Sequence, residues 1–281
     1  MPARLHHEKI AAAGADPGRW LVLTHGIYGT GGNWRSIARK VVDARREWGA
    51  VLVDLRQHGR SEAGPPPHTL DACAADLAAL CDELAAGGAP IDAVAGHSFG
   101  GKVVLAHRAS GAPSAARLRQ TWVLDSTPSV RPAMWEAADN DVRQVWEAMR
   151  ELPRRWPRRD DFVAALEARG HSRQLAQWLA QSLEPDGDGV RLRFDLDAIR
   201  DLLLDYYRRD LWPAVEDPAL PGDVHLVVAE RSSTVSAADR ARLAAEPPER
   251  RVATHLIPDA GHWLHIDAPR AVIDLLVAHL P

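Results

Sequence analysis

Residues 95–101, Ala-Gly-His-Ser-Phe-Gly-Gly, decide how the rest of the chain is interpreted. The apolar run Ile91–Ala95 is suited to a buried strand, and Lys102–Ala109, free of glycine and proline, is suited to a helix. A G-x-S-x-G motif between a strand and a helix is typical of a nucleophile elbow, a strained turn that lifts the serine hydroxyl clear of the sheet. The structural alternative is a glycine-rich turn in which the serine only caps the helix.

Ser98 needs a base, because a serine hydroxyl is a poor nucleophile at neutral pH. Of the 13 histidines, His262 is the best candidate, since it lies in the loop after the last predicted strand, over the carboxyl edge of the sheet. His265 is the second candidate, but it belongs to the start of the next helix. His225 and His255 fall inside predicted strands, where packing against the core or facing solvent is the expected role.

The acid that orients His262 has two candidates, each at the end of a predicted strand. They are Asp125 and Glu230, and both fit the chain order serine, acid, histidine. We favour Asp125, because aspartate is the shorter and more rigidly placed carboxylate. Asp259 is too close to His262 along the chain to turn back onto it comfortably.

A second glycine-rich loop follows the strand predicted at Trp20–Thr24. Residues 25–32 read His-Gly-Ile-Tyr-Gly-Thr-Gly-Gly, and such a loop exposes backbone N–H groups beside the carboxyl edge of the sheet. An oxyanion formed at Ser98 requires donors at that place. We predict the N–H of Phe99 as the first donor and the N–H of Ile27 as the second. The alternative is a flexible connector.

Apolar strands alternate with amphipathic helices over most of the chain. The strands are predicted at residues 20–24, 50–53, 91–95, 121–124, 224–228 and 252–257, with a weaker edge strand within 5–13. This alternation indicates right-handed crossovers and a mostly parallel sheet flanked by helices, the α/β class. From about residue 129 to 213 the pattern is helical, with no convincing strand. We therefore predict a core of residues 1–128 and 214–281, interrupted by a helical cap of residues 129–213.

The composition is that of an enzyme-sized globular chain. A net charge of −4 over 281 residues gives no cause to expect nucleic acid as a partner. No apolar stretch approaches the length of a membrane span, and the N-terminus lacks the hydrophobic core of a signal peptide. Cys73 and Cys81 are too far apart on a predicted helix for a disulfide within it. Reduced cysteines and a cytoplasmic location are therefore expected.

Five segments together resemble the α/β-hydrolase superfamily and, within it, the small esterases of the YbfF type. They are residues 25–26 (HG), 54–61 (DLRQHGRS), 96–102 (GHSFGGK), 123–128 (VLDSTP) and 260–265 (AGHWLH). The resemblance covers nearly the whole core and weakens in the cap.

This resemblance implies an eight-stranded sheet with a cap inserted after the sixth strand. It also implies hydrolysis of short to medium acyl esters or thioesters without a metal or cofactor. Members of the group carry the acid at the sixth-strand position, which supports Asp125. Glu230 stands where many relatives in the wider superfamily have an aspartate, a departure that agrees with the acid having moved.

Two features of the predicted cap bear on specificity. Five of the ten tryptophans fall in it, at positions 135, 146, 156, 178 and 212. Such rings can line an acyl pocket, although packing of the cap helices onto the core is the commoner role. The run RRWPRR at residues 154–159 invites a phosphate or coenzyme A hypothesis. We favour a solvated basic turn, because the run is short and is followed by Asp160 and Asp161.

These observations predict a serine hydrolase that acts on a small-molecule acyl ester or thioester through an acyl-enzyme. Ser98 is the predicted nucleophile, His262 the base and Asp125 the orienting acid. One alternative is a non-hydrolytic enzyme with the same site, a lyase or a perhydrolase. The other is a ligand-binding, receptor-like module that retains these side chains.

Overall fold

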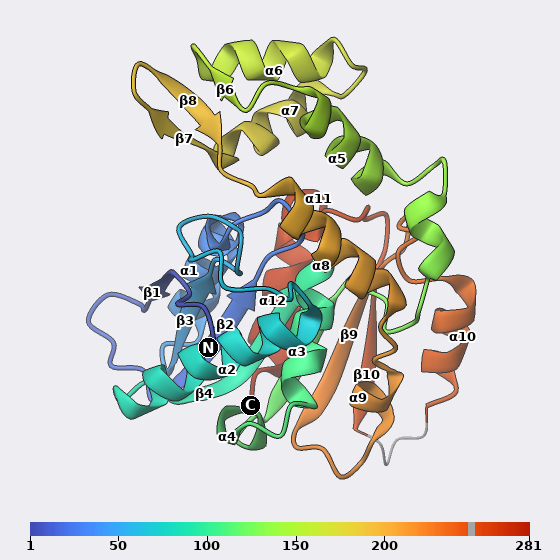
Figure 1. Cartoon of the computed structure of the whole chain (residues 1–281). Helices are drawn as coiled ribbons and strands as arrows, with labels where there is room; N and C mark the ends of the chain where they lie inside the picture. The colour runs from blue at the N-terminus through green and yellow to red at the C-terminus, as the bar shows by residue number, and fades with distance from the viewer. Residues whose placement is uncertain (247–250) are drawn as a thin grey trace.

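The computed structural model describes residues 1–246 and 251–281 (Figure 1). The strands of its main sheet are β1 His7–Ile10, β2 Arg19–Thr24, β3 Trp48–Val53, β4 Ile91–His97, β5 Gln120–Leu124, β9 Asp223–Ala229 and β10 Val252–Ile257. Their order in the sheet is β1-β3-β2-β4-β5-β9-β10. β1 runs antiparallel to β3 at one edge, and the other pairs are parallel. The predicted mostly parallel sheet with an N-terminal edge strand is confirmed.

The strand count differs from the expectation. Among the described residues the main sheet has seven strands, not eight. The number is lower because residues 1–18 supply a single short strand, β1, before the parallel part of the sheet begins. Asp125 therefore follows the fifth strand in chain order, β5, rather than a sixth.

Helices cover both faces of this sheet. Those outside residues 129–216 are η1 Gly31–Trp34, α1 Arg35–Ala44, α2 Leu70–Ala86, α3 Phe99–Arg108, α4 Pro113–Ala116, α10 Ala237–Ala244, α11 Leu264–Asp267 and α12 Pro269–His279. Side chains of a strand alternate between faces. Leu21 and Leu23 accordingly pack in a cluster with α1 and α12, and Val22 in a second cluster with α2 and α3. Cys73 and Cys81 are buried in α2 and free, as predicted.

Between β5 and β9 the chain forms a separate group of elements, most of which lie away from the sheet in Figure 1. They are η2 Pro132–Glu136, α5 Asp141–Glu151, β6 Arg155–Trp156, α6 Arg159–Glu167, α7 Arg173–Leu179, η3 Ala180–Ser182, β7 Leu183–Asp186, β8 Gly189–Leu192, α8 Leu196–Arg208 and α9 Trp212–Glu216. We call residues 129–213 the 129–213 segment. Like the predicted cap, it is rich in helices.

The 129–213 segment also contains a small antiparallel sheet, β6-β8-β7, so the expectation that it lacks strands was wrong. These strands are two to four residues long and largely polar, and no apolar alternation marks them. The available signal was the run Asp186-Gly187-Asp188-Gly189. Its Gly187 adopts a φ of +62°, as the two-residue turn between β7 and β8 requires.

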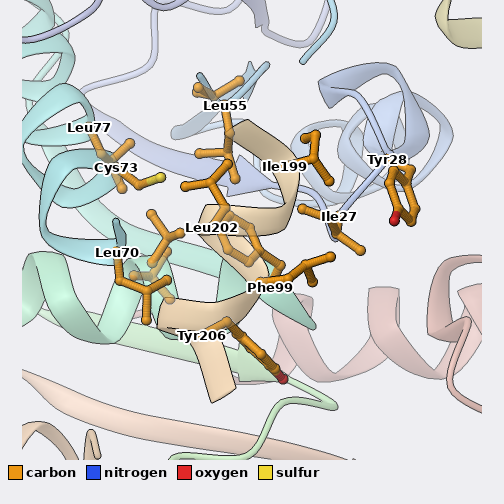
Figure 2. Close-up of a cluster of buried hydrophobic side chains, with 14 of the residues drawn as sticks. Ile27, Tyr28, Leu55, Leu70, Cys73, Leu77, Phe99, Ile199, Leu202 and Tyr206 are labelled. Atoms are coloured by element: carbon orange, nitrogen blue, oxygen red, sulfur yellow. The ribbon is translucent and has the colours of Figure 1, made fainter. Parts of the chain in front are cut away.

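Helix α8 joins the 129–213 segment to the core through one apolar face. Ile199, Leu202 and Tyr206 of this helix point into a buried cluster that also contains Ile27 and Phe99 (Figure 2). Ile27, in the loop after β2, and Phe99, the first residue of α3, carry the predicted oxyanion donors. The packing of α8 therefore fixes the elements on which the candidate site is built.

Lys102 ties both ends of the 129–213 segment to helix α3. Its ammonium group is buried and donates hydrogen bonds to the backbone carbonyls of Ser129 (2.9 Å), Tyr206 (2.8 Å) and Arg209 (2.6 Å). Burial lowers the pKa of this lysine to about 8. Ser129 begins the segment, whereas Tyr206 and Arg209 lie close to its end. The Lys102 ammonium group therefore binds the main chain near both ends of the segment.

The basic run at residues 154–159 is engaged in local contacts. Arg155 pairs with Asp186 and Asp188, and Arg158 pairs with Asp161. The two outer arginines of the run, Arg154 and Arg159, donate to backbone carbonyls. These contacts favour the basic-turn interpretation over a phosphate site.

No helix in the described part of the chain is long and apolar enough to cross a bilayer.

Candidate active site

Ser98 stands at the sharp turn between β4 and α3. Its φ of 52° and ψ of −116° are strained for a residue with a side chain. At its two glycines, the turn packs closely against other main-chain carbonyl groups. A Cβ atom on Gly96 would lie 2.1 Å from the carbonyl oxygen of Gly100, and one on Gly100 would lie 2.6 Å from that of His25. The strand, turn and helix that the motif predicts are thus present, with glycine required at both positions.

His262 reaches Ser98 from the loop between β10 and α11. Its Nε2 lies 3.0 Å from the Ser98 hydroxyl oxygen, so the ring can accept the hydroxyl proton. The second candidate, His265, lies in α11 and contacts neither Ser98 nor an acid among the described residues. Burial lowers the pKa of His265 to about 4. The geometry therefore joins His262, and not His265, to the serine.

Asp125 completes the contact from the end of β5. One of its carboxylate oxygens accepts the Nδ1–H of His262 at 2.6 Å and also the hydroxyl hydrogen of Ser232 at 2.6 Å. The other oxygen accepts the backbone N–H of Ala229 at 3.1 Å. Asp125 is fully buried, and these bonds satisfy its charge.

Glu230, the other candidate acid, is directed elsewhere. Its side chain is exposed and accepts the backbone N–H of Asp259 at 2.8 Å. It therefore holds the turn after β10, and no contact joins it to His262. The structure brings together Ser98, His262 and Asp125, the set favoured from sequence.

Several of the contacts that position His262 were not predicted from the sequence. The Nε2–H of His97 donates to the carbonyl oxygen of His262 at 2.7 Å, and the Thr234 hydroxyl lies 3.1 Å from Nδ1 of His262. Burial, followed by the nearby His262 ring, lowers the pKa of His97, so His97 stays neutral. His97 is one of the two variable residues of the G-x-S-x-G motif, and Thr234 with Ser232 belongs to an irregular loop. Only the polarity of that loop signalled a role.

The two predicted oxyanion donors face the same pocket as Ser98. In the described part of the chain, no hydrogen-bond acceptor contacts the N–H of Ile27 or of Phe99. Tyr28, next to Ile27, has a φ of 65°, and its N–H donates to Nε2 of His58 at 3.1 Å. Burial lowers the pKa of His58 to about 3, so its ring remains a neutral acceptor. His58 thus holds the loop in the conformation that leaves the Ile27 N–H free.

A pocket of about 500 Å³ lies over Ser98, between the core and the 129–213 segment. Its apolar lining includes Ile27, Phe99, Met134, Val142, Val145, Leu175 and Leu203. Of the five tryptophans in the segment, Trp178 lines this pocket, with its ring 4.7 Å from that of Trp263, the residue after His262. Trp135 and Trp146 are buried against each other. Trp178 therefore has a place in the pocket lining, whereas Trp135 and Trp146 pack against each other.

The described residues contain no group of three or more His, Cys, Asp or Glu side chains arranged to hold a metal ion. The expectation of a reaction without a metal or cofactor stays a prediction. Ser98, His262 and the two residues of the predicted oxyanion donors, Ile27 and Phe99, line one pocket. Such an arrangement is suited to acyl transfer.

Residues 21–275 match the model of the alpha/beta hydrolase family, and the chain belongs to that family. It is 28% identical to an sn-1-specific diacylglycerol lipase of Danio rerio, over 92% of this chain and 78% of that protein. It is also 28% identical to the esterase YbfF of Escherichia coli, over 92% of each chain. The solved structure of a marine microorganism esterase aligns with a TM-score of 0.80 at 22% identity, covering 98% of this chain and 99% of that one, which shows the shared fold.

These comparisons confirm the predicted superfamily and the similarity to YbfF. They also support the predicted enzyme class, a carboxylic ester hydrolase, because both relatives are named for the cleavage of esters.

Proposed function

We propose that this chain hydrolyses carboxylic esters or thioesters of small to medium acyl groups through a Ser98-His262-Asp125 triad. The observation that carries the proposal is the continuous hydrogen-bonded line from Ser98 to Asp125. Its two links measure 3.0 and 2.6 Å, and it ends on a buried carboxylate. A serine that only caps a helix does not require these hydrogen bonds, whereas nucleophilic catalysis depends on them.

In the first half of the reaction, the Ser98 oxygen attacks the substrate carbonyl carbon while His262 Nε2 takes the hydroxyl proton. Asp125 accepts the Nδ1–H and stabilises the imidazolium that forms. The C–O bond, or the C–S bond of a thioester, then breaks. His262 returns the proton to the leaving alcohol or thiol, and the acyl group stays on Ser98.

In the second half, His262 takes a proton from water, whose oxygen attacks the acyl carbon. The bond to Ser98 breaks, the serine regains its proton from His262, and the carboxylic acid leaves. In both halves the carbonyl oxygen becomes negatively charged. The N–H groups of Ile27 and Phe99, which have no other acceptor among the described residues, are the donors we assign to that oxygen.

We further propose that the 129–213 segment acts as a cap on a core formed by residues 1–128 and 214–281. Its side chains supply much of the apolar lining above Ser98. Such a lining excludes water from the tetrahedral intermediate and receives the acyl chain. A pocket of about 500 Å³ agrees with small to medium acyl groups.

The test is hydrolysis of p-nitrophenyl esters from acetyl to palmitoyl, with Ser98→Ala protein from the same preparation as the blank. We expect activity that peaks at one chain length and disappears in Ser98→Ala. Absence of activity above the blank on every ester would overturn the proposal and favour a lyase, a perhydrolase or a ligand-binding module.

A further inference from the structure

Arg131 is a cationic side chain of the candidate pocket with no role in the proposed chemistry. It lies at the start of the 129–213 segment, is half-buried and lines the pocket that contains Ser98. Its backbone N–H donates to the carbonyl of Tyr207 at 2.7 Å, and its Nη1–H donates to the carbonyl of Thr234 at 3.1 Å. The first bond fixes the main chain, and the second fixes one corner of the guanidinium.

Within the described part of the chain, the rest of the Arg131 guanidinium makes no hydrogen bond or ion pair. Among residues 1–246 and 251–281, no carboxylate lies within ion-pair distance of it, and the bond to Thr234 is the one side-chain hydrogen bond that it makes. A guanidinium carries five N–H donors. Arg231, which also lines the pocket, differs, because it is largely exposed and pairs with Asp259 at 2.5 Å. A half-buried guanidinium with free donors is suited to binding an anion.

Thr234 relates Arg131 to the reacting groups. The carbonyl oxygen of Thr234 accepts from Arg131, while its hydroxyl oxygen lies 3.1 Å from Nδ1 of His262. Arg131 is therefore one residue removed from the base of the triad. The guanidinium also opposes the rise that burial causes in the pKa of Tyr207, a ring lining the same pocket.

Two carboxylates, Asp139 and Asp141, line the pocket as well and have to be weighed against Arg131. Both side chains are exposed, at the N-terminal start of α5, so solvent screens their charges. The third carboxylate near the site, Asp125, is occupied by His262, Ser232 and Ala229. Among the charged side chains with which the 129–213 segment lines the pocket, the half-buried Arg131 is thus positive, and the exposed Asp139 and Asp141 are negative.

We propose that Arg131 binds a carboxylate carried by the substrate, and that the preferred substrates are esters with a carboxylate close to the scissile bond, such as half-esters of short dicarboxylic acids. This inference rests on the proposed ester hydrolysis at Ser98. The carboxylate would form paired hydrogen bonds with the free edge of the guanidinium while the apolar lining receives the rest of the molecule.

The test compares ester pairs in which one methyl group is replaced by a carboxylate. On the acyl side the pair is p-nitrophenyl butyrate and mono-p-nitrophenyl succinate. On the alcohol side the pair is ethyl acetate and acetoxyacetate, and their hydrolysis is monitored by the release of protons. The quantity measured is the ratio of kcat/KM for the charged ester to that for the neutral one. We expect this ratio to exceed one in at least one pair and to fall about ten- to hundredfold in Arg131→Gln.

Two further variants separate charge from structure. Arg131→Lys keeps the charge but loses the paired hydrogen bonds, so we expect an intermediate ratio. Arg208→Gln removes an exposed arginine of the same segment outside the pocket and should keep the wild-type ratio. A ratio that is the same in wild type and Arg131→Gln, or that does not exceed one in either pair, would overturn the inference while ester hydrolysis stands. If no neutral or charged ester is cleaved above the Ser98→Ala blank, the proposed function fails and this inference fails with it.

Discussion

The two walls of the pocket are built in different ways. On the core wall, Ser98 stands directly at the end of β4, and His262 joins it to Asp125, which is fully buried at the end of β5. The wall from the 129–213 segment comes from helices and loops, and it places apolar side chains beside the charged Arg131, Asp139 and Asp141. We infer that the core wall performs the chemistry and the segment wall selects the substrate. Substitutions on the core wall should lower the rate of hydrolysis of every substrate alike. Substitutions on the segment wall should change which substrate is preferred.

The largest expected effect is that of Asp125→Asn. The amide cannot stabilise the imidazolium, and it favours the wrong His262 tautomer, so kcat should fall on the order of 10⁴-fold on every ester. Glu230→Gln, the matched change at the other candidate acid, should leave kcat near wild type. Steady-state kinetics on the p-nitrophenyl panel checks both. A large loss in Glu230→Gln, or a loss in Asp125→Asn confined to one chain length, would contradict the division between the walls.

The next effect concerns the joint between the walls. Lys102→Met removes the ammonium and leaves the carbonyls of Ser129, Tyr206 and Arg209 without their donor. Relief of the desolvation of a buried charge offsets part of this loss, and we expect unfolding free energy to fall by about 3 kcal/mol. Urea denaturation measures the change, with the exposed Lys40→Met as control. Equal stability of the two variants would show that the joint does not depend on this cation.

A smaller effect follows from His58, a buried histidine that supports the loop of Ile27 and Tyr28. Burial lowers the pKa of His58 from its ordinary value of 6.5 to about 3 in the folded state, so between these values the unfolded chain binds more protons than the folded one. The contribution of His58 to stability is therefore complete above pH 6.5 and is lost as the pH falls towards 3. The slope approaches about 1.4 kcal/mol per pH unit.

His58→Gln, which keeps an acceptor for the Tyr28 N–H, should remove that slope. Unfolding free energies of both proteins at pH 7, 6 and 5 provide the test. Parallel curves would mean that His58 is not held neutral.

The smallest effect is expected on the segment wall. Trp178→Ala removes the ring that faces Trp263 and enlarges the pocket, so the preferred acyl chain should lengthen, with kcat on short esters changing only a few-fold. The measurement is KM across the acetyl to palmitoyl series. An unchanged chain-length optimum would assign Trp178 to packing, the role that Trp135 and Trp146 have in the same segment.

Sequence patterns predicted the core wall well, because a parallel sheet brings the ends of its strands to one edge and so places Ser98, Asp125 and His262 together. They predicted the segment wall poorly. The short polar strands β6, β7 and β8 have no apolar period, and the roles of Thr234 and Ser232 depend on the path of an irregular loop. The buried partners of His97 and His58 likewise depend on tertiary contacts between distant segments. The motifs at residues 54–61 and 96–102 contain these two histidines but do not show which groups they contact.

The hydrogen bonds of Lys102 have a consequence for how sequences of this architecture can diverge. Its three acceptors are main-chain carbonyls, which any residue type supplies at positions 129, 206 and 209. The side chains of the 129–213 segment can therefore be exchanged freely, as far as this attachment is concerned, while the core lysine stays the same. A fold anchored in this way can acquire new specificities by mutation above the pocket without redesigning the joint beneath it.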